Sequence, residues 1–337
     1  MKVMVLQDGH GADRLRIVER PIPTPRRQEI LIRMKATALN YRDVEIANGT
    51  YHTAFDFPLV PLSDGVGEVV AIGEEVTRFR VGDRVCSTFW QRWIGGSFRM
   101  AEPAYQLGGP IGGLLAEYAV LDEQAAVLAP RNLTDVEAAT LPCAAVTAWH
   151  ALVTEGGIKA GETVLAQGTG GVSLFGLQFA RASGARVIVT SSSDEKLERA
   201  RELGAFAGIN YRRNPQWSDA VLEITEGRGV DHVIEVGGPQ SFAQSLKASS
   251  RRGQINVIGY LGGKEGAINP LEIFTRQVQV RGIPVGSRES FEAMNRAIEA
   301  QNLKPVIERT FSWLDAAKAF RFLEEGEHFG KLGLVHS

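Results

Sequence analysis

Apolar residues recur along this chain with two different spacings. Between residues 145 and 286, short apolar runs of strand length alternate with segments whose apolar residues recur every three or four positions. This alternation predicts a doubly wound parallel sheet, the α/β class, with helices packed on the sheet. The predicted strands are residues 163–166, 186–189, 207–209, 230–235, 255–258 and 278–283, and the predicted helices begin near Gly171 and after Ser192 and then span 215–225 and 239–249.

The first 130 residues instead contain short strands separated by glycine and proline turns. The strands expected there are residues 2–6, 15–19, 29–34, 61–72 and 115–120, with a turn into a further strand at 76–85. Such a pattern predicts an irregular, mostly antiparallel and partly open barrel. Residues 87–113 mix glycines and aromatics without a period, which predicts a long loop near the mouth of a pocket.

The C-terminal segment resumes the alternation and is expected to return to the first domain. It contains a predicted helix at 289–301, a strand at 306–310, a helix at 315–325 and a last strand at 333–335. A helical segment at 134–148, interrupted at 141–143, leads into the parallel sheet. We therefore predict one domain from residues 1–144 and 287–337, and a second from residues 145–286.

The second domain opens with a strand, a glycine turn, a helix and a strand, the order of a dinucleotide-binding βαβ unit. Gly168 lets the chain leave the strand sharply, and Gly170 leaves no Cβ between the backbone and a pyrophosphate. The helix that begins near Gly171 points unpaired N–H groups at that phosphate. Ser173 replaces the third glycine of the motif, and it is small enough for close packing of helix on strand. A glycine-rich turn without a ligand is the alternative.

The end of the second strand of this unit favours NADPH over NADH. An NAD site usually carries a carboxylate there, whereas this strand ends in Thr190 and the serines 191–193. Lys196, Arg199 and Tyr211 follow nearby and offer hydrogen-bond donors to a 2′-phosphate. Ser192 and Glu195 are expected to form a helix capping box. The alternative for the two basic residues is a solvated helix face.

Composition excludes several other classes of function. The chain has 337 residues, 44% hydrophobic residues and a net charge of −2, so it offers no electrostatic attraction to nucleic acid or to an anionic membrane. No apolar run reaches the length of a membrane span, and the start resembles a short strand rather than a signal peptide, so we expect a cytoplasmic protein. The two cysteines, Cys86 and Cys143, predict neither a disulfide framework nor a zinc site of their own.

Motifs spread over most of the chain resemble those of the medium-chain dehydrogenase/reductase superfamily. They are Asn40–Asp43 (NYRD), Gly65–Val70 (GVGEVV), Val81–Val85 (VGDRV), Leu141–Cys143 with Thr147, Gly168–Val172 (GTGGV), Ala200–Ala205 and Asn210–Tyr211. The resemblance implies a GroES-like, mostly β catalytic domain, a Rossmann domain that binds NADP(H), and a C-terminal return to the catalytic domain.

The zinc enzymes of this superfamily hold a catalytic metal through a cysteine, a His-Glu pair and a second cysteine. At the corresponding positions this chain has Asn40, the pair Ser63-Asp64, and Cys143. One thiolate without an imidazole is too few ligands for catalytic zinc, and residues 87–113 contain no cysteine for a structural zinc lobe. We therefore expect no metal, with Cys143 serving as a small buried residue. The alternative is an atypical zinc site that recruits Cys143 and Asp64.

Without zinc, the chain is similar to the quinone oxidoreductase branch of the superfamily. Hydride transfer to a carbonyl, enone or quinone builds negative charge on an oxygen, which needs a hydrogen-bond or proton donor. The resemblance suggests Tyr41 as that donor, with Asn40 as a second polar group. The alternative for Tyr41 is a packed aromatic side chain, and Asp43 is expected to fix the local turn or to pair with an arginine.

The remaining site residues follow from the resemblance and from the ends of the strands, where open α/β sheets bind ligands. The predicted cofactor contacts are Thr147, Gly168, Gly170, Gly171, Val172, Ser191, Lys196, Tyr211, Val236, Gly237, Gly259 and Tyr260. Glu235 also ends a strand, without an assigned role. The aromatics Phe89, Trp90, Trp93 and Phe98 either wall a substrate pocket or pack under their own loop.

The sequence therefore predicts an NADPH-dependent, zinc-independent oxidoreductase that reduces a small carbonyl, enone or quinone. A zinc-type alcohol dehydrogenase and a non-catalytic NADPH-binding relative are the alternatives. The apolar edge strand at 278–283 further suggests a homodimer.

Overall fold

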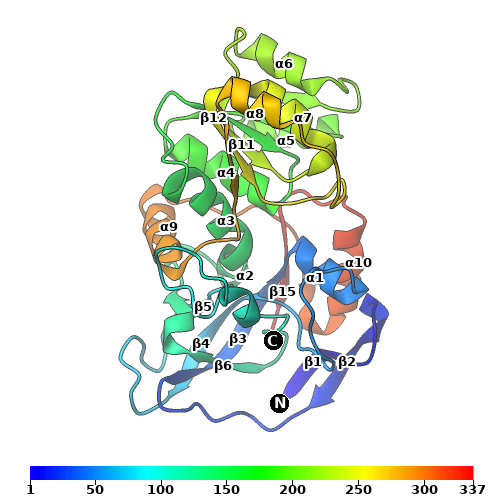
Figure 1. The fold of residues 1–337 in the computed structure, drawn as a ribbon. Coiled ribbons are helices and arrows are strands. Elements are labelled where there is room, and N and C mark those ends of the chain that lie inside the picture. The colour runs from blue at the N-terminus through cyan, green and yellow to red at the C-terminus, as the bar shows by residue number, and fades with distance from the viewer. Residues whose placement is uncertain (337) are drawn as a thin grey trace. The chain divides into compact units, whose positions relative to one another are not determined.

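The computed structural model describes residues 1–336 and divides the chain into two compact units (Figure 1). One unit comprises Met1–Val146 and Gly286–Ser337, and the other comprises Thr147–Val285. The bounds predicted from the sequence lie within two residues of this division. Both chain ends belong to the first unit (Figure 1).

The second unit contains a six-stranded sheet in the order β10-β9-β8-β11-β12-β13, and every neighbouring pair is parallel. This confirms the predicted parallel Rossmann sheet. The strand order reverses between β8 and β11, and ligands of such sheets bind at the carboxyl ends of the strands beside this reversal. The strands are β8 (Thr163–Gln167), β9 (Arg186–Ser191), β10 (Ala207–Asn210), β11 (Val230–Glu235), β12 (Ser249–Val257) and β13 (Gln279–Gly282).

Helices cover this sheet and exclude water from its central strands. The helices are α4 (Gly171–Ala182), α5 (Asp194–Glu202), α6 (Trp217–Ile224), α7 (Pro239–Ala248) and α8 (Pro270–Arg276), preceded by α3 (Val146–Trp149) and the π-helical turn η5 (His150–Thr154). Because β8 is buried along its whole length, its sequence is a continuous apolar run rather than an alternating one. Leu165, Ile188 and Val233 form part of the core that these strands share.

Close packing of α4 on the sheet depends on two small residues. A Cβ at Gly176 would lie 2.1 Å from the Cδ1 atom of Ile234 on β11, so this position has no room for a side chain. Ser173 is buried, and its hydroxyl donates to the carbonyl of Gln167 at 2.5 Å. Serine in place of the third glycine is therefore tolerated, as predicted, because its hydroxyl is satisfied at the end of β8.

The first unit is built on a mostly antiparallel sheet in the order β14-β15-β3-β4-β5-β7, with β6 also paired to β3. A separate antiparallel pair is formed by β1 (Lys2–Leu6) and β2 (Leu15–Glu19). The sheet strands are β3 (Glu29–Leu39), β4 (Asp64–Ile72), β5 (Arg84–Ser87), β6 (Tyr118–Asp122), β7 (Ala126–Leu128), β14 (Ile307–Ser312) and β15 (Lys331–Val335). Because β15 pairs with β3, the predicted return of the C-terminal segment to the first unit is confirmed.

Short helices connect and flank these strands. They are η1 (Ala12–Arg14), α1 (Tyr41–Asn48), η2 (Glu102–Tyr105), η3 (Glu123–Ala125), α2 (Asp135–Ala139), the π-helical turn η4 (Leu141–Ala145), α9 (Arg288–Gln301), η6 (Trp313–Asp315) and α10 (Ala316–Glu324). α10 lies beside α1 and packs on β14 and β15. Its buried Phe320 joins a core that also contains Leu39 and Leu334.

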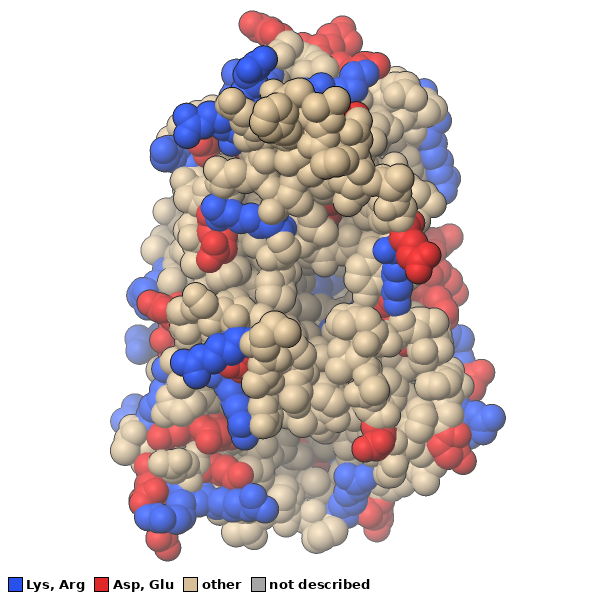
Figure 2. Space-filling model, viewed as in Figure 1, with Lys and Arg blue, Asp and Glu red and all other residues tan. Residues whose placement is uncertain are grey.

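Acidic and basic side chains are interspersed over the face drawn in Figure 2, and no large area of that face carries one sign of charge. This distribution matches the small net charge of −2. Among residues 1–336, no helix is both long enough and apolar enough to cross a lipid bilayer.

His336 makes the stability of the first unit depend on pH. Its ring is buried, stacks on Trp313 with a centroid distance of 4.9 Å, and lies 3.2 Å from the Thr37 hydroxyl. Burial lowers the pKa of His336 to about 4 from its ordinary value of 6.5. The unfolded chain therefore binds a proton at a higher pH than the folded chain does, so stability is complete above pH 6.5 and is lost as the pH falls toward 4.

We predict that the wild type loses about 1.4 kcal/mol more unfolding free energy than His336→Gln between pH 7.5 and 5.5. The expected cause is protonation of His336 in the unfolded chain alone. Urea denaturation of both proteins at the two pH values measures the difference. Equal losses in the two proteins would contradict the assignment, and the comparison cancels the effects of other titrating groups.

Candidate functional site

The glycine turn after β8 leaves an open amide cradle, which we define as residues 168–172. Gly168 has φ +71°, a conformation that favours glycine. A Cβ built on Gly168 or on Gly170 would meet nothing within 4 Å. α4 begins after Gly170 without a side-chain cap and without an acidic residue in its first turn. Its first N–H groups are thus available to an anion, and the cradle fits a diphosphate.

A second helix N-terminus at the same edge of the sheet is filled by a buried carboxylate. Glu235 ends β11 and is fully buried. Its Oε1 atom accepts hydrogen bonds from the N–H groups of Gly237 at 2.9 Å and Gly238 at 3.0 Å, and from the hydroxyl of Ser241 at 2.5 Å. Glu235 therefore holds the loop that leads into α7 from inside the protein, which is the role that the sequence did not reveal.

Gln167, the last residue of β8, ties this capped loop to the cradle. Its amide nitrogen donates to Glu235 Oε2 at 2.7 Å, and its amide oxygen accepts from the N–H groups of Val236 and Gly237 at 3.2 and 3.1 Å. The N–H group of Gly259 donates to the carbonyl of Glu235, so the loop that carries Gly259 and Tyr260 joins the same network. The structure thus brings four of the predicted cofactor residues together at one edge of the sheet. Thr147 lies on α3 and is buried.

The residues predicted to bind a 2′-phosphate lie at the ends of β9 and β10. The N–H group of Tyr211 donates to the carbonyl of Ser191 at 3.0 Å, which holds the two strand ends together. Lys196 is partly exposed in the first turn of α5, and Tyr211 is 42% exposed. Ser191 and Tyr211 therefore meet at this strand end, and Lys196 follows in the first turn of α5.

The helix cap and the charges here differ in part from the expectation. The capping residue of α5 is Ser193, whose hydroxyl accepts from the N–H group of Lys196 at 3.3 Å, so the predicted box of Ser192 and Glu195 is wrong by one position. Consecutive serines made the two positions indistinguishable from the sequence. Asp194 pairs with Arg213 at 2.5 Å, so its negative charge is balanced locally.

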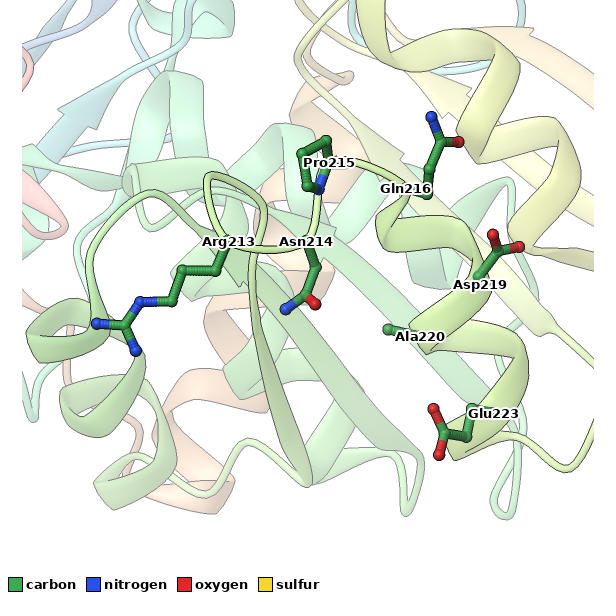
Figure 3. A pocket seen from close by; sticks show the side chains of 7 residues that line it. All are labelled: Arg213, Asn214, Pro215, Gln216, Asp219, Ala220 and Glu223. Atoms are coloured by element: carbon green, nitrogen blue, oxygen red, sulfur yellow. The ribbon is translucent and has the colours of Figure 1, made fainter.

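An open hollow of about 370 Å³ lies between the loop of residues 213–216 and α6 (Figure 3). Figure 3 shows that its side chains are Arg213, Asn214, Pro215, Gln216, Asp219, Ala220 and Glu223. None of the predicted cofactor residues lines it. The guanidinium of Arg213 points away from α6 and pairs with Asp194, while the two carboxylates lie on α6, so the hollow does not favour an anion (Figure 3).

In the first unit, three strands bring a buried polar cluster together at the end of β3. Leu332 of β15 pairs with Leu39, and Asp64 of β4 pairs with Ala38, so β15 and β4 flank the last residues of β3. Asn40 follows directly and begins α1. We call the side chains of Asn40, Asp43, Asp64, Cys143 and Lys331 the polar cluster.

Asp43 has the structural role expected of it. Its Oδ2 atom accepts from the N–H group of Asn40 at 2.8 Å, which caps α1, and its Oδ1 atom lies 3.3 Å from the guanidinium of Arg42. Both expected roles, fixing the turn and pairing with an arginine, are confirmed. Burial raises the pKa of Asp43 to about 6, and Arg42 opposes the shift.

Tyr41, the predicted donor, is 46% exposed at the first position of α1. A second phenol, Tyr51, lies beside the polar cluster. Its hydroxyl donates to the side-chain oxygen of Gln106 at 3.0 Å, and the guanidinium of Arg42 lies 5.0 Å from the centre of its ring. Burial raises the pKa of Tyr51, and Arg42 opposes the shift. Sequence reasoning missed Tyr51, which lies beyond the end of α1 and is placed by the turn at Gly49.

Asp64 belongs to the Ser63-Asp64 pair, which stands where zinc enzymes of the resembled superfamily have a His-Glu pair. It is fully buried and accepts hydrogen bonds from the hydroxyl of Ser63 at 2.7 Å and from the N–H group of Cys143 at 3.1 Å. Burial raises the pKa of Asp64, and the Lys331 ammonium is the strongest opposing influence. Burial of the thiol and the nearby charge of Asp64 raise the pKa of Cys143.

This donor set does not fit a catalytic zinc ion. It offers one carboxylate, one thiol that resists ionisation, and an amide, with an ammonium among them. Within residues 1–336, no three His, Cys, Asp or Glu side chains are placed to hold a metal ion. Cys143 is only partly buried, so the expectation of a buried residue holds in part.

The aromatic side chains of the 87–113 loop pack mainly on one another. Trp90 and Trp93 both contact Phe98 edge to face with centroid distances of 4.9 Å, and Phe89 contacts Trp90 at 4.8 Å. Phe89, Trp90 and Trp93 are buried. Of the two roles considered from the sequence, these contacts match packing of the rings under their own loop.

Two family models match the chain. The model described as "Alcohol dehydrogenase GroES-like domain" matches residues 26–131, and the model described as "Zinc-binding dehydrogenase" matches residues 171–300. A zinc-type alcohol dehydrogenase-like protein of Schizosaccharomyces pombe is 42% identical over 99% of both chains. A quinone oxidoreductase of Homo sapiens is 28% identical over 90% of this chain and 88% of its own.

Solved structures resemble the chain over its whole length. One described as an NAD-dependent alcohol dehydrogenase is 34% identical, has a TM-score of 0.92, and is covered completely in both directions. A mycobacterial protein solved in complex with NADPH is 26% identical, with a TM-score of 0.83 and complete coverage of both chains.

We predict that Gly170→Ala weakens dinucleotide binding about tenfold or more without loss of stability, because its methyl group meets only the space reserved for the diphosphate. The φ of −79° at Gly170 suits alanine. Isothermal titration with NADPH and a thermal melt measure the two quantities. Gly282→Ala is the matched control, since a Cβ there also meets nothing within 4 Å. Unchanged affinity in Gly170→Ala would contradict the cradle.

Proposed function

Because the chain belongs to the medium-chain dehydrogenase/reductase superfamily of oxidoreductases, we propose that it is an NADPH-dependent, zinc-independent enzyme. Its proposed substrate is a small carbonyl compound, enone or quinone, which it reduces by hydride transfer. The observation that supports the proposal most strongly is the amide cradle at residues 168–172, which is open, whereas a buried carboxylate, that of Glu235, occupies the loop that leads into α7.

The choice of NADPH rests on the end of β9. Ser191 stands near the strand end, where an NAD site would have a carboxylate, and Lys196 and Tyr211 lie close to it. A 2′-phosphate gains charge-assisted hydrogen bonds from such groups. One solved relative is described as NAD-dependent and another was solved with NADPH, so the family permits both cofactors.

The residues that would hold the cofactor are those of the cradle, the Val236–Gly237 loop and the Gly259–Tyr260 loop. Bound NADPH would supply the hydride. The chain itself must supply a donor for the oxygen that becomes negative. Tyr41 and Tyr51 are the candidate phenols, and Asn40 is the candidate amide. Tyr51 is favoured by its place, because its ring lies beside Arg42 and its hydroxyl donates to Gln106 next to the polar cluster.

The zinc independence of the proposed enzyme rests on the chemistry of the polar cluster. Asp64 is engaged by Ser63 and by the backbone of Cys143, and the cluster contains the Lys331 ammonium, which repels a cation. Zinc prefers thiolates and imidazoles in a tetrahedral arrangement. The Schizosaccharomyces pombe relative is named a zinc-type protein. At the three metal-binding positions of the zinc enzymes, however, this chain has Asn40, the pair Ser63-Asp64, and Cys143.

We also propose a cytoplasmic homodimer that joins the exposed edges of β13. This strand ends the six-stranded sheet, and Val280 on it is 40% exposed. An edge strand with unpaired N–H and C=O groups can pair with its copy around a twofold axis.

We predict that Lys196→Ala raises the Michaelis constant for NADPH about tenfold or more and leaves that for NADH within about twofold. The loss of an ammonium that faces a 2′-phosphate is the expected cause, because NADH carries no such phosphate. Initial rates with each cofactor measure the effect. Lys159→Ala, an exposed lysine of the same unit, is the matched control. A wild type that prefers NADH would overturn the choice of cofactor.

We predict that Tyr51→Phe lowers kcat about 100-fold with unchanged affinity for NADPH, because the substrate oxygen loses its donor. Tyr41→Phe is the paired variant. Stopped-flow turnover and a separate NADPH titration measure the two constants. A large effect of Tyr41→Phe with little effect of Tyr51→Phe would return the role to Tyr41, and no effect of either would remove both phenols from the mechanism.

A further inference from the structure

The polar cluster contains a lysine that is almost completely buried. Lys331, the first residue of β15, is 4% exposed. Its ammonium donates to the side-chain oxygen of Asn40 at 2.6 Å and to the carbonyl of Leu39. Burying an ammonium costs desolvation free energy unless opposite charges and hydrogen bonds compensate it. The groups around Lys331 must therefore supply that compensation.

Two buried carboxylates provide the compensating charge. Lys331 is the strongest influence that lowers the pKa of Asp64 against its burial, and it also lowers that of Asp43. Asp43 has Arg42 as its nearer cation, at 3.3 Å. Leu332 pairs with Leu39 and Asp64 pairs with Ala38, so Lys331 and Asp64 approach the end of β3 from the two strands that flank it.

The lysine also fixes the orientation of Asn40. Because the amide oxygen of Asn40 accepts from the ammonium, its NH₂ group must point in the opposite direction. That nitrogen is buried and has no hydrogen bond of ordinary geometry among the described residues. The Asn40 side chain also lowers the pKa of Asp64 through a hydrogen bond, so its NH₂ group is directed toward that carboxylate.

We propose that Lys331 supplies the fixed positive charge of this cluster in place of a metal ion and acts as the positioning residue for Asn40. The ammonium offsets the buried charge of Asp64 across the end of β3 and holds the Asn40 amide with its NH₂ group directed toward that carboxylate. The part of this proposal that concerns charge is independent of the proposed function, whereas the part that concerns Asn40 as a donor rests on it.

A double-mutant cycle between Lys331 and Asp64 tests the charge. Lys331→Met keeps much of the volume and removes the ammonium, and we expect it to lower the midpoint of thermal unfolding strongly or to prevent folding. Adding Asp64→Asn to Lys331→Met should recover at least half of that loss, because the uncompensated carboxylate is gone. If the two losses add, or if the double variant fails to fold as well, then the lysine acts through packing and the proposal is overturned.

An exposed lysine–aspartate pair of the same unit provides the matched control. Lys318 lies 2.8 Å from Asp315, and both side chains are largely exposed. The cycle of Lys318→Met and Asp315→Asn should show little coupling, because solvent screens exposed pairs. Equal coupling energies in both cycles would contradict the claim that Lys331 compensates the buried charge of Asp64.

Zinc analysis provides a readout that does not depend on activity. We expect the wild type, equilibrated with zinc and then dialysed free of unbound metal, to retain far less than one zinc per chain. Stoichiometric zinc lost on Asp64→Asn substitution would show that a metal ion, rather than Lys331, serves Asp64, and would overturn the proposal.

Kinetics separate the positioning role from a structural one. In the folded Lys331→Met/Asp64→Asn protein, we expect kcat to fall about as far as in Asn40→Ala, with the Kd for NADPH unchanged. Adding Asn40→Ala should then lower kcat little further. Independent, additive effects would overturn the positioning role. A wild type without NADPH binding would instead reject the proposed function, while the stability cycle would still decide the charge.

Discussion

The arrangement of the second unit depends on how backbone N–H groups are satisfied where the parallel strands end. α7 and α4 both begin at this edge of the sheet, but of the two loops that lead into them only the one before α7 holds a buried carboxylate, that of Glu235. The start of α4 has neither a side-chain cap nor an acidic residue. Because unsatisfied amides at a helix start attract anions, this difference marks where a diphosphate belongs. Gln167 connects the two places through Glu235.

In the polar cluster of the first unit, buried carboxylates rather than backbone N–H groups need partners. Burial raises the pKa of Asp43 and of Asp64, so each needs a cation or a donor nearby. Arg42 serves the first and Lys331 the second. Residues far apart in the sequence meet here because β3 pairs with β4 on one side and with β15 on the other. A site assembled in this way can keep its charge balance without a metal ion.

The sequence predicted the parallel sheet because it depends on strong local patterns, whereas the C-terminal return, which pairs β15 with the distant β3, followed from the family resemblance. Apolar runs mark the buried strands, and the glycine turn marks the start of α4. The first half of β12 was missed because its polar residues Ser249 to Arg252 hide a strand, and α8 was missed because none of its residues is buried. Tyr51, Glu235 and Lys331 were missed for another reason: their roles arise from contacts with residues distant in the sequence, which periodicity does not reveal.

The central claim is that this chain reduces its substrate with NADPH and without a metal ion. Consumption of NADPH by chelator-treated protein, followed across a panel of quinones, enones and ketones, tests it most directly. The account predicts turnover of at least one compound class, with a rate that added zinc does not raise. Absence of NADPH oxidation across the panel, or activity that appears only when zinc is restored, would contradict it.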